Sequence, residues 1–219
     1  MEALGARADG QVLDLACGPG VLTAVLCERA RHVTGLDLTP RVLEVARRSA
    51  DPERSAFALG AAERTPFADG SFDGVAIRLA LHHVQDPQAV LREARRVTRP
   101  GGRLVVLDVL TSSDPRIAAA HNEIERRRDP SHTSFVPGEV LREGVEAAGF
   151  GVAADERWRS RRSFSEWAAI IDDPARMEDV ERRLRAHVDA DEKLGIDLRV
   201  EAGELCFDYP WALIAADAC

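Results

Sequence analysis

Short apolar runs alternate with amphipathic stretches along residues 11–110, and this alternation limits the fold more than any other feature. The runs have the length and composition of buried strands: QVLDLA (11–16), HVTGLD (32–37), SAFALG (55–60), SFDGVAIRLA (71–80) and RLVVLDVL (103–110). Apolar residues recur at helical spacing in the intervals 20–31, 40–49 and 86–97, and the first of these is expected to turn Val21, Leu22, Val25 and Leu26 inward. Such alternation predicts an α/β fold, a mostly parallel sheet with helices on both faces.

The regular alternation of apolar runs and amphipathic stretches ends after residue 110. Helices are expected over 137–148, 163–171 and 174–194, and strands over 150–158 and 204–216. Pro210 lies inside the last strand, which favours an edge position or a bulge, because proline cannot donate to a strand ladder. One domain is expected over residues 1–219, with lid insertions at about 111–136 and 160–200.

The bulk chemistry argues against two classes of partner. A net charge of -8 gives no general affinity for nucleic acid or an acidic membrane, because neutralising phosphates requires a basic surface. The four cysteines form no CxxC pair, so reduced thiols and a cytoplasmic location are expected. No apolar run of about 18 residues indicates a membrane span, and no leader pattern opens the chain.

Ligands of parallel sheets bind beyond the carboxyl ends of the strands, so the residues that follow each strand are the site candidates. The turn 16–20, ACGPG, follows the first strand, and its small side chains let a ligand approach the backbone. A tight turn that binds nothing is the alternative. Asp37 ends the second strand, where a carboxylate can accept hydrogen bonds from both ribose hydroxyls. Its other possible role is to cap the helix at Pro40, although Thr39 is closer to that helix.

Two cofactor classes compete for such a turn. A dinucleotide site requires G-x-G-x-x-G, and this spacing is not present here. Asp14 stands inside the first strand, where its negative charge suits a cofactor with a positive amino group better than a pyrophosphate. The pattern therefore favours S-adenosylmethionine, which has a zwitterionic methionine end and a positive sulfur, over NAD.

Five motifs, VLDLACGPG, TGLDLT, GAAERTPFADGSFD, ALHHVQDP and VTRPGGRLVV, follow one another at the spacing of class I S-adenosylmethionine-dependent methyltransferases. Residues 11–110 most resemble the small-molecule branch that includes the ubiquinone- and menaquinone-type C-methyltransferases. The resemblance implies a Rossmann-like sheet of seven strands, of which the first five are parallel and the last two form a reversed hairpin. It also implies methyl transfer to a carbon or oxygen of a small organic molecule.

The resemblance further implies a set of cofactor contacts at the strand ends. These are Asp14, Ala16, Gly18 and Gly20 around the methionyl end and the ribose, Asp37 on the ribose hydroxyls, Leu38 on adenine, and Arg78 near the reaction site. Ala61 stands where relatives often carry an aspartate that reaches the adenine amino group, so this contact is missing. The backbone of Ala62 and the side chain of Glu63 are left to replace it.

Three residues are expected to take part in catalysis or substrate binding. His83, with His82 beside it, follows the fourth strand at the pocket edge, where a histidine can orient or deprotonate a hydroxyl. The alternative for this pair is to cap the next helix or support the site. Asp108, near the end of the fifth strand, is a candidate base or substrate anchor, and His132 is the candidate contact from the lid. No further ligand at metal spacing accompanies the adjacent histidines, so no metal is expected.

The closure of the site is a further expectation. Relatives commonly place one or two helices ahead of the first strand, whereas about ten residues precede it here. We therefore expect the segments 111–136 and 160–200, or a second subunit of a homodimer, to close the site, with dimer contacts from 174–194. Two rival functions remain open. One is a non-methylating cyclisation or rearrangement with the same cofactor, and the other is a NAD-dependent oxidoreductase.

Overall fold

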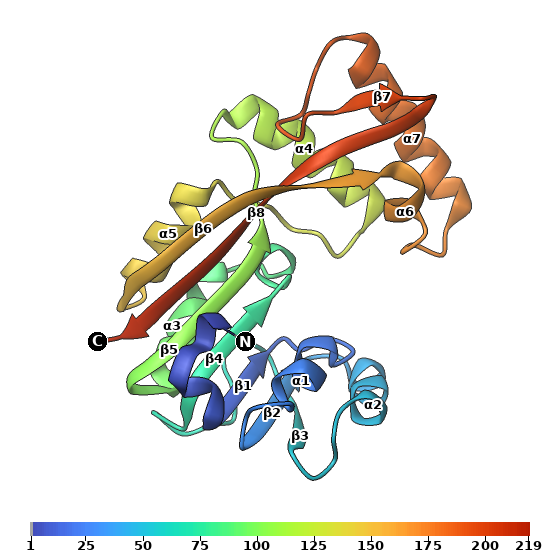
Figure 1. Ribbon diagram of the computed structural model, residues 1–219. Helices are drawn as coiled ribbons and strands as arrows, with labels where there is room; N and C mark the ends of the chain where they lie inside the picture. The colour runs from blue at the N-terminus through green and yellow to red at the C-terminus, as the bar shows by residue number, and fades with distance from the viewer. Residues whose placement is uncertain (1) are drawn as a thin grey trace.

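The computed structural model describes residues 2–219, which form one mixed sheet with helices on both faces (Figure 1). The strands are β1 (Gln11–Leu15), β2 (His32–Asp37), β3 (Ser55–Leu59), β4 (Phe72–Arg78), β5 (Thr98–Val109), β6 (Phe150–Ser163), β7 (Arg199–Glu201) and β8 (Glu204–Ala218). Their order is β3-β2-β1-β4-β5-β8-β6, and β7 pairs with β8. β1 to β5 are parallel, and β8 runs antiparallel between β5 and β6. The predicted fold is confirmed, and β7 is an addition that the sequence pattern did not indicate.

Three helices begin where the sequence supplies an aspartate followed by a proline. α3 (Pro87–Val97), α4 (Pro115–Arg128) and α7 (Pro174–Asp189) carry proline in the first turn, and the preceding aspartate accepts a hydrogen bond from a backbone N–H of that turn. The other helices are η1 (Glu2–Asp9), α1 (Val21–Leu26), α2 (Pro40–Ser49), η2 (Leu81–His83), α5 (Gly138–Ala147) and α6 (Phe164–Ala168). None of the helices described has the length and apolar composition needed to cross a membrane.

α1 is shorter than the helix predicted over 20–31, and the residues that it buries are not all the expected ones. Thr23 and Leu26 are buried, whereas Val21 and Val25 are 56% and 43% exposed. The expectation that both valines point inward is wrong. A helix of six residues makes fewer than two turns, so it presents only one narrow side to the sheet.

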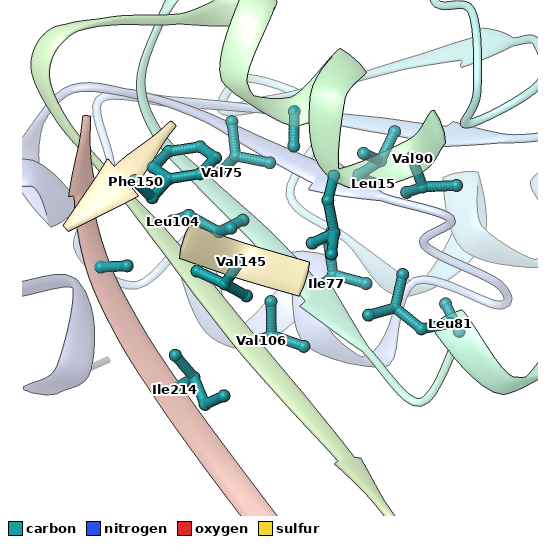
Figure 2. Close-up of a cluster of buried hydrophobic side chains, with 14 of the residues drawn as sticks. Leu15, Val75, Ile77, Leu81, Val90, Leu104, Val106, Val145, Phe150 and Ile214 are labelled. Atoms are coloured by element: carbon teal, nitrogen blue, oxygen red, sulfur yellow. The ribbon is translucent and has the colours of Figure 1, made fainter. Parts of the chain in front are cut away.

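The main core lies between the sheet and the helices α3 and α5. Figure 2 shows Ile77 of β4, Val106 of β5 and Ile214 of β8 close to Val145 of α5, within one buried cluster. A second cluster on the opposite face contains Leu4 of η1 and residues of α1. Burial on both faces explains why the strand sequences are continuous apolar runs. The same packing holds in place the strand ends at which the site lies.

β6 and β8 continue past the end of β5 and carry a second, smaller lobe (Figure 1). α4, α6, α7 and β7 gather there around a separate apolar cluster that includes Trp167 and Phe207. Both predicted lid segments contribute helices to this lobe. The apolar side of α7, formed by Met177, Val180 and Leu184, is buried within it, so this side is occupied by the chain itself and is not left for a dimer contact.

Pro210 lies in an inner strand, and the prediction of an edge position is wrong. Its carbonyl accepts a hydrogen bond from Leu110 N, directly after β5 ends at Val109. Pro210, which has no N–H to donate, therefore lies where the pairing of β5 with β8 ends and not within the paired region.

Candidate active site

The carboxyl ends of the parallel strands meet at one edge of the sheet. The register pairs Leu15 with Leu36 and Asp14 with Ala76, which places Ala16 between Asp37 and Arg78. The pairing of Asp37 with Leu59 adds the segment 60–63, which follows β3. The residues predicted to bind the cofactor therefore gather at this edge, although they come from four separate segments of the chain.

The turn after β1 uses a backbone conformation that favours small residues. Ala16, Gly18 and Gly20 have φ angles of 60°, 53° and 80°. A Cβ atom on Gly20 would lie 2.9 Å from the Cβ of Ala46, so a side chain there would push α1 away from α2. On Gly18 the same atom would have nothing within 4 Å. Gly20 is thus required for packing, whereas the turn opens at Gly18, where a ligand can approach the backbone.

The Asp37 carboxylate joins two turns of this edge. Its Oδ2 accepts a hydrogen bond of 2.9 Å from Gly18 N, and its Oδ1 accepts one of 2.9 Å from Thr39 N. The side chain of Thr39, the N-cap residue of α2, makes no capping hydrogen bond. Because each carboxylate oxygen can accept a second hydrogen bond, Asp37 keeps acceptor capacity for a pair of hydroxyls.

Asp14 lies behind the turn and is 1% exposed. Its Oδ2 accepts a hydrogen bond of 2.6 Å from Thr23 Oγ1 in α1. Burial raises the pKa of Asp14 to about 6, while the hydrogen bond from Thr23 and the positive charge of Arg78 act in the opposite direction. A ligand bound at the turn would therefore lie close to the negative charge of Asp14, which is buried behind the turn.

The far end of the edge is apolar and partly uncovered. Leu38 is 69% exposed, which is high for a leucine beside a polar turn. Gly60 N donates to the carbonyl of Asp37, and the carbonyl of Ala61 accepts a hydrogen bond from Arg64 N. Ala62 is buried in the main core. A flat ring could lie against Leu38, and alanine at position 61 offers it no side-chain carboxylate.

A cavity of about 280 Å³ begins beside the end of β4. Leu79, which follows Arg78, lines it together with His82, Phe135 of the segment after α4, Trp167 of α6 and Tyr209 of β8. Rings form much of its wall: the Phe135 centroid lies 4.8 Å from that of His82 and 6.3 Å from that of Tyr209. The smaller lobe and the sheet edge therefore enclose an aromatic cavity between them.

His82, which lines this cavity, forms a close pair with Asp108, which does not line it. His82 Nδ1 lies 2.5 Å from Asp108 Oδ1, and their side chains are 11% and 5% exposed. Asp108 also accepts hydrogen bonds from the backbone N–H groups of Leu81 and Val109. The carboxylate is therefore held in place from three directions and acts on its surroundings through His82. We expected Asp108 to face a ligand directly and placed His83 ahead of His82, and this geometry favours His82.

His83 and His132 take other partners. His83 Nδ1 lies 3.0 Å from Ser131 Oγ, and its ring centroid is 4.2 Å from that of His82. Desolvation and the neighbouring His82 lower the pKa of His83. His132 Nε2 lies 2.8 Å from Asn122 Oδ1, and burial lowers the pKa of His132 to about 3. Both residues line the cavity, and His132 is neutral there at ordinary pH.

Comparison with known proteins identifies the family. A methyltransferase-domain family model matches residues 13–106. The demethylmenaquinone methyltransferase of Beutenbergia cavernae is 48% identical over 112 residues, which cover 51% of this chain and 45% of the relative. That of Mycolicibacterium vanbaalenii is 35% identical over 177 residues, 73% of this chain and 75% of the relative. The chain belongs to the class I S-adenosylmethionine-dependent methyltransferases.

The fold of this methyltransferase is shared along its whole length. A methyltransferase structure from Bacillus halodurans superposes with a TM-score of 0.88 at 24% identity and covers 99% of this chain and 96% of the other. By contrast, the chain spans about half the length of the curated relatives that match it first. The family and the cofactor, S-adenosylmethionine, are therefore as predicted from the motifs, and the acceptor has to be argued from the site.

The strand-end residues of the methyltransferase fit this cofactor. The open side of Gly18 leaves room at the backbone, and the Asp37 carboxylate offers acceptors for ribose hydroxyls. Leu38 offers an exposed apolar surface for adenine, and the buried charge of Asp14 suits a cationic amino group or sulfur. Within the described residues, no group of three or more His, Cys, Asp or Glu side chains is arranged to hold a metal ion.

The sequence did not indicate several residues of the aromatic cavity. Arg128, Trp167, Tyr209 and Trp211 line it, and none follows one of the first five strands. Tyr209 is the only tyrosine of the chain, and its hydroxyl donates to the buried Glu125. Glu125 lies in the segment 111–136, which we expected to form a lid, but nothing in the sequence paired it with a residue 84 positions away.

We predict that Asp14→Asn stabilises the protein without cofactor and weakens cofactor binding. The pKa of Asp14 rises from 3.8 to about 6 on folding, so the folded state holds this proton more tightly and loses stability as pH rises through that window. Asparagine removes this cost and can still accept from Thr23, for a gain of up to about 3 kcal/mol near neutral pH. Thermal unfolding should show a gain at about pH 7 that disappears near pH 4. An equal gain at both values would contradict the assignment.

Proposed function

We propose that this methyltransferase transfers a methyl group from S-adenosylmethionine to a carbon or oxygen of a quinone-type aromatic molecule in its reduced, hydroxylated form. The observation that carries the proposal is His82, which lines an aromatic cavity next to the methionyl end of the sheet edge and is paired with Asp108. The names of the curated relatives support the acceptor class. Rings along the wall suit a flat aromatic acceptor, since they offer apolar faces and edges to stack against.

The cavity is large enough for a small ring system. A cavity of roughly 150 Å³ can hold benzene, whereas this one measures about 280 Å³. Its polar groups stand at particular points of the wall, which is the usual arrangement in sites that orient an apolar ligand. A molecule of one or two fused rings with hydroxyl groups therefore fits both the size and the chemistry.

The residues of the chain would act as follows. Asp108 accepts a hydrogen bond from Nδ1–H of His82, which leaves Nε2 of His82 free to take up the proton of a hydroxyl of the methyl acceptor. Loss of that proton makes the hydroxyl oxygen, and the ring carbon beside it, nucleophilic. S-adenosylmethionine supplies, when bound, a methyl group on a positively charged sulfur. The walls of the cavity hold the methyl acceptor in line and keep water away. After transfer to oxygen, His82 releases the hydroxyl proton to solvent. After transfer to the ring carbon, that carbon loses its own proton and the oxygen is protonated again.

The lobe formed by α4, α6 and α7 is proposed as the lid. Three rings of the cavity wall come from this part of the chain: Phe135 from the segment after α4, Trp167 from α6 and Tyr209 from the extension of β8. Ile170, which follows α6, is 71% exposed although it lines the same cavity, as expected for a side chain at an entrance. Closure by a second subunit stays a prediction, and a solution mass equal to one chain would rule it out.

The direct test is to incubate the purified protein with S-adenosylmethionine and naphthohydroquinone without oxygen. We expect S-adenosylhomocysteine and a product heavier by one CH₂ unit, both measured by mass spectrometry. Conversion of the acceptor without S-adenosylhomocysteine would instead favour a cyclisation or rearrangement. Thermal stabilisation by NAD and not by S-adenosylmethionine would favour an oxidoreductase, because a ligand of the native state raises the melting temperature.

A further inference from the structure

Glu125 is a buried carboxylate that the reaction above does not use. It is 2% exposed in α4, and it lines the same cavity as His82. Its Oε1 accepts the hydrogen bond from the Tyr209 hydroxyl, and its Oε2 lies 3.4 Å from Arg128 Nη1. A carboxylate has about four acceptor positions, and strong ion pairs have N–O distances of about 2.7–2.9 Å. Glu125 therefore has fewer and weaker donors than its burial requires.

The surroundings of Glu125 offer no better partner. His121 Nε2 lies 3.9 Å from Glu125 Oε1, and within the described part of the chain neither this atom nor Arg128 Nε has a hydrogen-bond partner. The Arg128 guanidinium is instead stacked over the Trp167 ring, 4.6 Å from its centroid. Burial raises the pKa of Glu125, which reflects the same shortage. A buried carboxylate with incomplete partners is costly, so a hydrogen-bond donor from a ligand would complete this site.

Glu125 and His82 line the cavity at two different places. The Phe135 ring is close both to the ring of His82 and to that of Tyr209, the donor to Glu125. An aromatic methyl acceptor stacked against Phe135 would therefore have His82 and the Tyr209–Glu125 pair within its surroundings. His82 and Glu125 both favour a hydroxyl group on the ligand, because each offers it a hydrogen-bond acceptor.

We propose that Glu125 binds a second hydroxyl of the aromatic acceptor and so selects acceptors with two hydroxyls over acceptors with one. The inference rests on the proposed function, since it assigns a residue to the specificity of that same cavity. Tyr209 and Arg128 act as positioning residues, which hold the carboxylate by its hydrogen bond and its charge.

The test measures ligand binding, so that it does not depend on turnover. The protein, saturated with S-adenosylhomocysteine, is titrated by calorimetry without oxygen with naphthohydroquinone and with α-naphthol, which lacks the second hydroxyl. We expect the native protein to bind the dihydroxy ligand about 10- to 100-fold more tightly, as for one hydrogen bond to a charged group. Glu125→Gln should reduce this preference to within about threefold and leave the affinity for α-naphthol unchanged.

Glu123→Gln is the matched control. Glu123 lies on the same helix, is exposed, and pairs with Arg127 at the surface, so its replacement should leave the preference intact. The proposal is overturned if Glu125→Gln retains the preference, if neither ligand binds, or if both affinities fall equally together with the melting temperature, as a purely structural role would require. A preference that depends on Glu125 in a protein that forms no S-adenosylhomocysteine would preserve this inference and reject the proposed function.

Discussion

Asp37→Ala is expected to weaken S-adenosylmethionine binding by at least about 100-fold. The carboxylate offers acceptors for two ribose hydroxyls, and each hydrogen bond to a charged group contributes about 1.5–3 kcal/mol. A loss of about 3 kcal/mol corresponds to roughly two orders of magnitude in Kd. The substitution also removes the acceptors of Gly18 N and Thr39 N, which lie 2.9 Å away, so the binding turn loses part of its support. Isothermal titration calorimetry with the purified variant measures the effect.

Two further measurements separate binding from stability. Glu44→Ala, at an exposed position of α2, is the control for the loss of one negative charge. It should leave the affinity for S-adenosylmethionine unchanged. The melting temperature of Asp37→Ala without cofactor reports the loss of support for the turn. If Asp37→Ala binds the cofactor within about threefold of the native protein while remaining folded, Asp37 does not hold the ribose and the assignment fails.

The cofactor edge is the part of the molecule that the sequence predicts best. Its residues directly follow strands that are recognisable as apolar runs, and parallel pairing must bring those ends together. Local spacing therefore places Asp14, Gly18 and Asp37 at this edge, and their contacts with the cofactor stay predictions. The failures nearby are equally local: the length of α1 and the exposure of Val21 depend on how the helix packs, which periodicity does not report.

The acceptor cavity could not be predicted in the same way. His82 and Asp108 become neighbours because Arg78 pairs with Leu107 in the β4–β5 register, a detail that the separate strands do not reveal. Trp167 and Tyr209 reach the cavity because β6 and β8 continue past β5 and fold the smaller lobe back over the sheet edge. Such contacts join residues far apart in the sequence, and single-residue patterns carry no information about them.

His82→Gln is expected to lower kcat by about 100- to 10,000-fold while the affinity for S-adenosylmethionine changes less than about twofold. His82 faces the acceptor cavity, whereas the predicted cofactor contacts lie at the ends of β1 to β4. Glutamine can still donate to Asp108 but cannot take up and release a proton. Steady-state kinetics measures kcat, and calorimetry measures the affinity for S-adenosylmethionine.

The comparison with His83→Gln decides between the two histidines. His83 has Ser131 as its partner and no carboxylate to fix its tautomer, so its loss should lower kcat far less. Asp108→Asn should mimic His82→Gln in kcat, because the correct tautomer of His82 depends on that carboxylate. A larger loss for His83→Gln than for His82→Gln, with both variants folded and binding the cofactor, would return the role of base to His83, the residue that the sequence favoured.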